Sequence, residues 1–371
     1  MTNTPLRYVR YPGPCAWPGQ GRAFLAAILL AVALAAISAH ISPAEARKNG
    51  GAAGSVHFRE AVALYQAHKY EEAHRLASML AKRGHPEALA MLGVLHEHGR
   101  GVQQDIAQAA KWYRQAAERG HTGAMFALSM IHLDGRLGAK DPQQARMWLE
   151  RAAKRGMVEA QYNLGLLHAG VSGHKPDWQK AAYWFRKAAE KGYGLAQYNL
   201  GVLYLKGRGV PRDFAEASEW FKKAALAGLP QGATDYGLLV FRGEGVSKDE
   251  RIGALWLEYA ARGGFAPAMQ KLARLYATGR GVRKDPLKAA KWYLLAKKRG
   301  AQDAWLDLFL KHLPEKTLKE AQQAAAGFRP TKMRKVQSGG HRANGNSQAS
   351  NGGVGGVDGN GTGGNGVTKT R

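Results

Sequence analysis

Histidine recurs at a fixed spacing in this sequence and is a residue type that binds metal ions. The column consists of His96, His132 and His168, which are 36 residues apart. Adjacent helices pack about 8 to 10 Å apart, whereas a nitrogen ligand lies about 2 Å from zinc. His96-Glu97-His98 also lacks the i, i+4 histidine pair of a helical zinc site. Tyr204 and Tyr276 continue the same 36-residue spacing further along the chain. The pattern therefore indicates that histidine takes the place of tyrosine at these three positions.

Other chemistries leave little trace in the sequence. Glycine-rich loops such as Gly207-Arg208-Gly209-Val210 resemble phosphate cradles, but no GxxxxGK[ST] motif is present and no predicted strand precedes them. No GxSxG motif or separate Asp/Glu/His constellation occurs. The only cysteine, Cys15, precedes a predicted cleavage site, so a cleaved product contains no thiol. We therefore predict that the protein is not an enzyme and binds no cofactor.

The elements that position these residues come from an internal repeat. The tryptophans recur every 36 residues without insertion or deletion: Trp112, Trp148, Trp184, Trp220, Trp256 and Trp292. An aromatic column could stack on sugars or bases, but alanines at helical spacing flank each tryptophan, which favours a core position. Aspartates and glycines share the same period, so we predict six contiguous units over residues 85–300.

Each unit is predicted to be a pair of helices. The periodic aspartate is an N-cap signal for the second helix, and Pro142 and Pro286 follow it at N1. Cations and then glycine mark its end, as in Lys154-Arg155-Gly156. The first helix carries a small residue at one fixed position, which predicts a close helix crossing because glycine inside a helix costs about 1 kcal/mol relative to alanine. These small residues are Gly93, Ser129, Gly165, Gly201, Gly237 and Ala273.

The units resemble the Sel-one-like repeats, which are related to the tetratricopeptide repeat. The motif here is Ala196-Gln197-Tyr198-Asn199-Leu200-Gly201-Val202-Leu203-Tyr204, then Gly207-Arg208-Gly209-Val210, Asp213, Ala217, Trp220, Ala224-Ala225 and Gly228. It weakens in two loops, Gly135-Arg136-Leu137-Gly138 and Val171-Ser172-Gly173-His174. The resemblance implies an all-α, right-handed α-α solenoid of stacked helix pairs that binds a protein or peptide on its concave face.

The segments around the repeats have distinct predicted roles. Residues 1–46 resemble a signal peptide, and 47–54 form a linker. We predict capping helices over 55–84 and 301–327, because terminal repeats would otherwise expose an apolar face. Residues 328–371 are rich in glycine and asparagine and carry several cations, which predicts a disordered basic tail.

Charge and the N-terminus narrow the location and the partner. The 371-residue chain has 54 Lys and Arg against 28 Asp and Glu, a net charge of +26. Three arginines precede the apolar run 23–39, and Ala44-Glu45-Ala46 provides a cleavage site. These features predict a bacterial periplasmic or secreted protein; the alternative is an inner-membrane anchor at 23–39 with the array outside the cytoplasm. Membrane contact is expected only if this segment is uncleaved, and export disfavours nucleic acid as a partner.

By resemblance to tetratricopeptide arrays, three columns of the first helices would contact the partner. They contain Tyr162, Tyr198 and Gln270; Met130, Leu166, Val202 and Arg274; and His98, Lys206 and Arg242. Aromatic, apolar and cationic groups together suit peptide recognition. We therefore expect a non-catalytic periplasmic scaffold or regulator. The alternative is a structural binder of acidic envelope polymer such as peptidoglycan, driven by charge and weakened steeply by salt.

Overall fold

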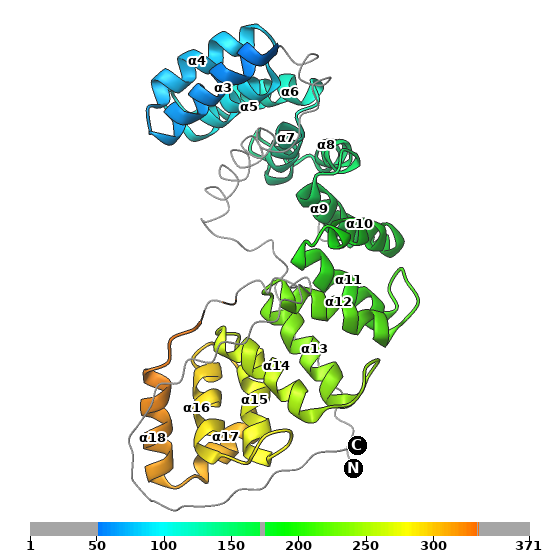
Figure 1. Ribbon diagram of the computed structural model, residues 1–371, viewed down its shortest axis with the longest axis vertical. Helices are drawn as coiled ribbons and strands as arrows, with labels where there is room; N and C mark the ends of the chain where they lie inside the picture. The colour runs from blue at the N-terminus through cyan, green and yellow to red at the C-terminus, as the bar shows by residue number, and fades with distance from the viewer. Residues whose placement is uncertain (1–50, 171–174, 332, 334–371) are drawn as a thin grey trace, which may run out of the picture. The chain divides into compact units, whose positions relative to one another are not determined.

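A computed structural model describes residues 51–170, 175–331 and 333, and within these ranges it contains helices and no strands. The signal segment 1–46 and the loop 171–174 lie outside the described residues. Each repeat contributes two helices that pack side by side (Figure 1). The first helices are α5 (Pro86–His98), α7 (Thr122–Asp134), α9 (Val158–His168), α11 (Gly194–Lys206), α13 (Pro230–Arg242) and α15 (Ala266–Thr278).

The second helices begin at the periodic aspartates, as predicted. They are α6 (Ile106–Glu118), α8 (Pro142–Lys154), α10 (Trp178–Glu190), α12 (Phe214–Leu226), α14 (Glu250–Arg262) and α16 (Pro286–Lys297). In all six, the aspartate carboxylate accepts a hydrogen bond from a backbone N–H of the first turn. This cap satisfies a donor that has no partner within the helix.

Successive second and first helices also pack on each other, so every repeat contacts the next. Glycine at the end of each second helix has positive φ, for example 91° at Gly156 and 87° at Gly228, which lets the chain turn at once into the next helix. The tryptophan column lies in the hydrophobic core or packs against it, as predicted. The fold is therefore an α-helical solenoid of stacked pairs, in agreement with the predicted class.

Helices before and after the repeats cover the two ends of the described array. Helices α3 (Gly51–Gln66) and α4 (Tyr70–Lys82) precede α5, and α4 packs on α5. Helix α3 begins inside the predicted linker 47–54, where Ala52 and Ala53 favour helix. Helices α17 (Ala304–Lys311) and α18 (Glu315–Ala326) follow the last repeat, and α18 packs on α16.

Residues 328–331, the first part of the predicted disordered tail, are ordered. The Phe328 ring packs edge-on against Trp292 with ring centroids 5.5 Å apart, and the Thr331 backbone N–H donates to the Arg262 carbonyl at 2.9 Å. An aromatic residue and a backbone hydrogen bond therefore order 328–331 against α14 and α16. The remainder of the tail, from residue 334, lies outside the described residues.

Candidate functional site

The two predicted tyrosines on the first helices lie at different depths. Tyr162 is 5% exposed, and its ring packs against Phe185 and Tyr193 with centroid distances of 5.8 and 5.0 Å. Tyr198 is partly buried, and its hydroxyl donates to Oδ2 of Asp235 in the next repeat at 3.1 Å. Tyr162 is therefore a packing residue in this structure, while Tyr198 connects α11 to α13.

The predicted apolar column is also partly buried. Met130, Leu166 and Val202 pack against the hydrophobic core of their own part of the array. Their exposed edges give the first-helix surface an apolar character.

Gln270 and Arg274 connect the last repeat to the helix that follows it. Arg274 donates from Nε and Nη2 to the two carboxylate oxygens of Asp303, each at 2.7 Å, and Gln270 Nε2 donates to Asp303 Oδ2 at 3.1 Å. Burial by itself would raise the pKa of Asp303, but the hydrogen bonds from Arg274, Gln270 and the Leu306 backbone lower it. This arrangement explains both residues structurally, because Asp303 also caps α17.

The third predicted column ends in two exposed cations. His98 Nδ1 lies 3.0 Å from the Val94 carbonyl oxygen within its own helix. Lys206 and Arg242 occupy the last turns of α11 and α13, and both are exposed. A cation there is favoured by the negative end of the helix dipole, but this does not account for the other cations gathered around these two.

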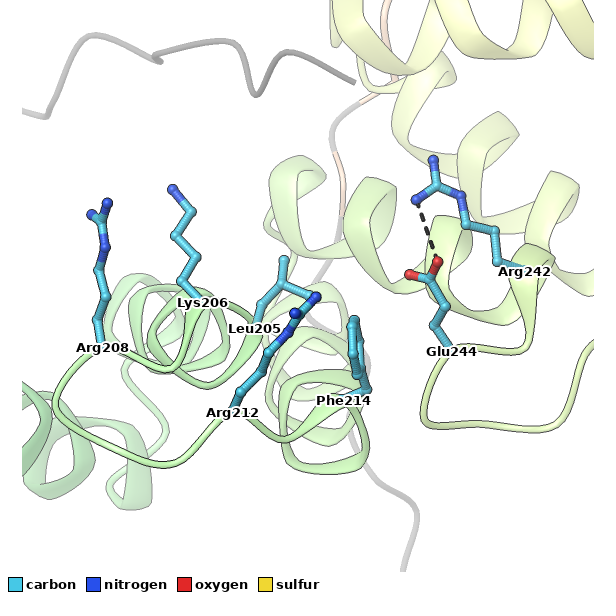
Figure 2. A pocket seen from close by; sticks show the side chains of 7 residues that line it. All are labelled: Leu205, Lys206, Arg208, Arg212, Phe214, Arg242 and Glu244. Atoms are coloured by element: carbon cyan, nitrogen blue, oxygen red, sulfur yellow. Dashed lines mark ion pairs between the residues drawn. The ribbon is translucent and has the colours of Figure 1, made fainter. Parts of the chain in front are cut away.

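Lys206 and Arg242 line a pocket of about 480 Å³ between the fourth and fifth repeats. The other lining residues are Leu205, Arg208, Arg212, Phe214 and Glu244. In Figure 2, Lys206 and Arg208 project in the same direction, and Arg242 and Glu244 come from the following repeat. Arg242 Nη1 lies 3.8 Å from Glu244 Oε1, so one carboxylate partly offsets four cations.

A second pocket, of about 510 Å³, lies between the fifth and sixth repeats and shares Arg242 with the first. Its cations are Arg242, Lys248, Lys271, Arg274 and Arg280. Leucine, phenylalanine and threonine supply the remainder of its lining, and none of the lining residues is acidic: Leu238, Phe241, Leu257, Leu275 and Thr278. The two pockets therefore form one cationic surface with apolar side chains, which we call the 206–280 surface.

Asp235 lies next to the cations of both pockets. Burial raises the pKa of Asp235 to about 6, although the Tyr198 hydroxyl and the charges of Lys271, Arg242 and Lys206 oppose that rise. Burial also lowers the pKa of Lys271 and of Lys206. These opposite shifts show that charged groups have been brought together in a partly desolvated region.

Carboxylates form ion pairs with several cations of this surface. Arg242 pairs with Glu244, Arg274 with Asp303, and both Lys248 and Arg280 with Glu250. Counting these three carboxylates and Asp235 against the eight cations of both pockets leaves a charge of about +4, since 8 − 4 = 4. The surface therefore attracts anions.

Sequence reasoning missed five cations of this surface. Arg208, Arg212 and Arg280 lie in inter-helix loops, Lys248 precedes the α14 cap, and Lys271 lies one position after a predicted column. The positions equivalent to Lys271 in the other repeats change from apolar Met91 and Ala127 in the first two repeats to Asp235 in the fifth and Lys271 in the sixth. The signal was therefore the shift from apolar to charged residues in the later repeats.

Two other features bear on what the surface can do. Within the described part of the chain, no group of three or more His, Cys, Asp or Glu side chains is arranged to hold a metal ion. No helix in that part is both long and apolar enough to cross a bilayer, and the run 23–39 lies outside it.

The comparisons with known proteins agree on the fold. The model of the Sel1 repeat matches residues 86–121, 122–157, 158–193, 194–229, 230–265 and 266–300. Among solved structures, c5321, a protective antigen of uropathogenic Escherichia coli with an SLR fold, is 28% identical with a TM-score of 0.61. The alignment covers 75% of this chain but only 62% of that antigen.

A Sel1 repeat protein from Oxalobacter formigenes is also similar. It is 28% identical with a TM-score of 0.55, and the alignment covers 67% of this chain and 99% of that protein. A search of curated proteins gave no match. Sel1 repeat proteins are generally non-catalytic scaffolds that commonly mediate protein–protein interaction. The six consecutive matches cover more than half of the sequence, and this chain belongs to the Sel1 repeat family.

Proposed function

We infer that this chain is a non-catalytic scaffold that acts outside the cytoplasm and binds a protein partner through the first helices and inter-helix loops of its later repeats. The observation that carries this is Arg242, which lines two adjoining pockets and so makes one surface from three repeats. Stacked repeats suit such a role because they display a continuous surface on a rigid body. Export is supported by the arginines and apolar run that precede Ala46.

The partner is tested by crosslinking and recovery from the cell envelope with the full chain. Wild type is compared with Lys206→Gln/Arg242→Gln, and with Lys111→Gln/Arg114→Gln, which removes the same charge from exposed positions on α6. We expect one protein to be recovered with wild type and the α6 variant, and lost with the pocket variant. Equal recovery by all three would contradict binding at the 206–280 surface.

The alternative is charge-driven binding of an acidic envelope polymer, and the excess of cations over carboxylates favours it as a second candidate. The same experiment in low and moderate salt separates the two. Polymer binding would fall steeply with salt and respond equally to both double variants, because only total charge would matter.

Location is tested separately by fractionation and intact mass. A mature chain beginning near Arg47 in the periplasmic fraction would support cleavage after Ala46. Recovery of the uncleaved chain with the inner membrane would support the anchored alternative. Recovery in the cytoplasm would contradict export.

A further inference from the structure

The 206–280 surface has positive charge, apolar side chains and two pockets at a fixed separation. These three properties together restrict which protein partners it can bind. Lys206, Arg208 and Arg212 line the first pocket together with Leu205 and Phe214. In the second, Lys248, Lys271 and Arg280 line the pocket together with leucine and phenylalanine side chains. An occupant therefore needs negative charge for the cations and apolar groups for the side chains between them.

The size of the pockets favours side chains of an extended segment. Volumes of about 480 and 510 Å³ are within the range of small-molecule sites. Each pocket forms between adjacent repeats, so the distance between the two pockets is about the distance between neighbouring first helices. Helices α13 and α15 are in contact. Helices in contact lie about 8 to 10 Å apart. An extended chain in the polyproline II conformation rises about 3.1 Å per residue and turns every third side chain to the same side, so side chains three residues apart can face the two pockets.

Resting on the proposed function, we propose that the 206–280 surface binds an extended peptide segment of its partner that carries two acidic side chains about three residues apart, with apolar residues between them. One acidic side chain enters the pocket lined by Lys206, and the other enters the pocket lined by Lys271. Arg242 lines both pockets, so it lies between the two acidic side chains and donates hydrogen bonds to the segment there. Charge-assisted hydrogen bonds from arginine to carboxylate supply geometric selectivity as well as attraction.

Several cations of this surface also have structural roles, which limits the choice of variants. Arg274 holds Asp303, and Arg280 Nη2 lies 2.6 Å from Glu250 Oε1, so substituting either would change the packing between elements. Arg242 is better suited, because its carboxylate partner Glu244 lies only two residues further along the chain, at 3.8 Å. Gln is the replacement of choice, because it keeps a polar side chain and removes the charge.

The test uses the full chain and a fluorescein-labelled extended peptide with two glutamates separated by two apolar residues. Fluorescence anisotropy at moderate salt measures its affinity for wild type, Arg242→Gln and the control Arg114→Gln on α6. We expect Arg242→Gln to weaken binding about tenfold or more, as for loss of a charge-assisted contact. The α6 variant should stay within about twofold. Equal effects of the two substitutions would overturn the proposal.

A second measurement tests direct pairing. In a peptide with its Lys206-side glutamate changed to glutamine, Lys206→Gln should have no further effect, whereas independent, additive losses would contradict the contact. Moving the two glutamates next to each other should weaken binding to wild type. Circular dichroism of each variant confirms that folding is retained.

Competition and recovery distinguish the other outcomes. Hyaluronate, an acidic polysaccharide, and unlabelled peptide are compared as competitors at equal concentrations of negative charge. If they displace the labelled peptide equally well, the surface recognises charge alone and the peptide proposal fails. If Arg242→Gln abolishes recovery of the envelope partner but does not change affinity for the peptide, the scaffold function stands and the acidic motif is wrong. Loss of both, with Arg114→Gln unaffected, supports both proposals.

Discussion

At the scale of single residues, the fixed small position of the first helices is explained by a side chain of the second helix. A Cβ added at Gly201 would lie 2.8 Å from Cδ1 of the Phe221 ring, and one at Gly165 would lie 2.6 Å from Cδ1 of Phe185. Such distances are too short for an ordinary contact. The second repeat, which carries the larger Ser129, has Leu149 in place of the aromatic ring. In the first four repeats, glycine therefore accompanies an aromatic ring and serine accompanies leucine.

We predict that Gly201→Ala destabilises the array by about 1 to 3 kcal/mol, because overpacking forces the Phe221 ring or α11 to move. Thermal unfolding followed by circular dichroism measures the change. Adding Phe221→Leu should recover part of the loss, since the ring is then removed. If the double variant is as unstable as the sum of the single variants, the clash is not the cause.

Asp235 provides a prediction of pH dependence. Its pKa is raised to about 6, so the folded state binds a proton more tightly than the unfolded state does. Its favourable contribution is therefore complete below the unfolded pKa, near 4, and is lost as pH rises through 6. Asp235→Asn imitates the protonated form and can still accept from Tyr198.

We therefore expect Asp235→Asn to be more stable than wild type at pH 7.5, by about 1 to 3 kcal/mol, and equal to it below pH 4. Thermal denaturation across pH 4 to 8 measures the difference. A gap that is constant with pH would show that the effect is not titration of this carboxyl. The control Asp134→Asn, at an exposed position at the end of α7, should show no such trend.

At the scale of elements, one buried carboxylate connects the first two repeats. Glu97 in α5 accepts from the Tyr113 hydroxyl in α6 at 2.6 Å and from Arg136 Nη1, in the loop after α7, at 2.6 Å. Glu97 is 5% exposed, and burial, followed by the nearby charge of Glu97, raises the pKa of Tyr113 well above its usual value. Later repeats have apolar residues at this position, such as Leu205 and Phe241.

Substituting Glu97 by alanine should destabilise the protein by about 3 kcal/mol, because it leaves a partly buried guanidinium and a buried hydroxyl without this partner. Chemical denaturation gives the size of the loss. Glu150→Ala, which removes an exposed i, i+4 pair with Arg146 at 3.9 Å, should cost less than about 1 kcal/mol. Similar losses for the two variants would show that the Glu97 contacts do not hold the repeats together.

At the scale of the whole molecule, stability depends on covering the last repeat. Helix α18 packs on α16, and Trp292 of α16 is 5% exposed beneath Phe328. Gly263 and Gly264 lie close to Met333 and Pro330, so the chain after α18 also covers the end of α14. Repeats contact only their neighbours, so a terminal repeat without such cover exposes its apolar face.

We predict that ending the chain at Leu313 lowers the melting temperature by several degrees, roughly 2 to 4 °C for each kcal/mol lost, and shifts tryptophan fluorescence to longer wavelength. Ending it at Val336 instead removes no described helix and should leave both unchanged. If the chain that ends at Leu313 melts at the same temperature as the full chain, α18 is dispensable for the fold.

Much of the fold could be predicted from the sequence, because its signals are local and repeated. The 36-residue spacing, the aspartate caps and the helix-ending glycines each act within one or two turns of backbone, so Asp213 and Gly228 marked the ends of α12 without any knowledge of its neighbours. The family resemblance followed from the same motif and is confirmed. The start of α3 at Gly51 and the order of residues 328–331 were missed. Phe328 contacts Trp292 and Thr331 contacts Arg262, and composition alone does not reveal contacts between residues so far apart in the sequence.

Only the tertiary structure decided which side chains meet and which reach the surface. The columns containing Tyr162, Lys206 and Arg274 were equivalent on the helical period, yet one is buried by Tyr193, one lines a pocket and one holds Asp303. Whether any of these residues contacts a partner stays a prediction. The physical reason for the difference is that exposure depends on the side chains of the neighbouring repeat and its loops. Periodicity sets the direction of a residue on its own helix, but the adjacent repeat decides what that residue contacts.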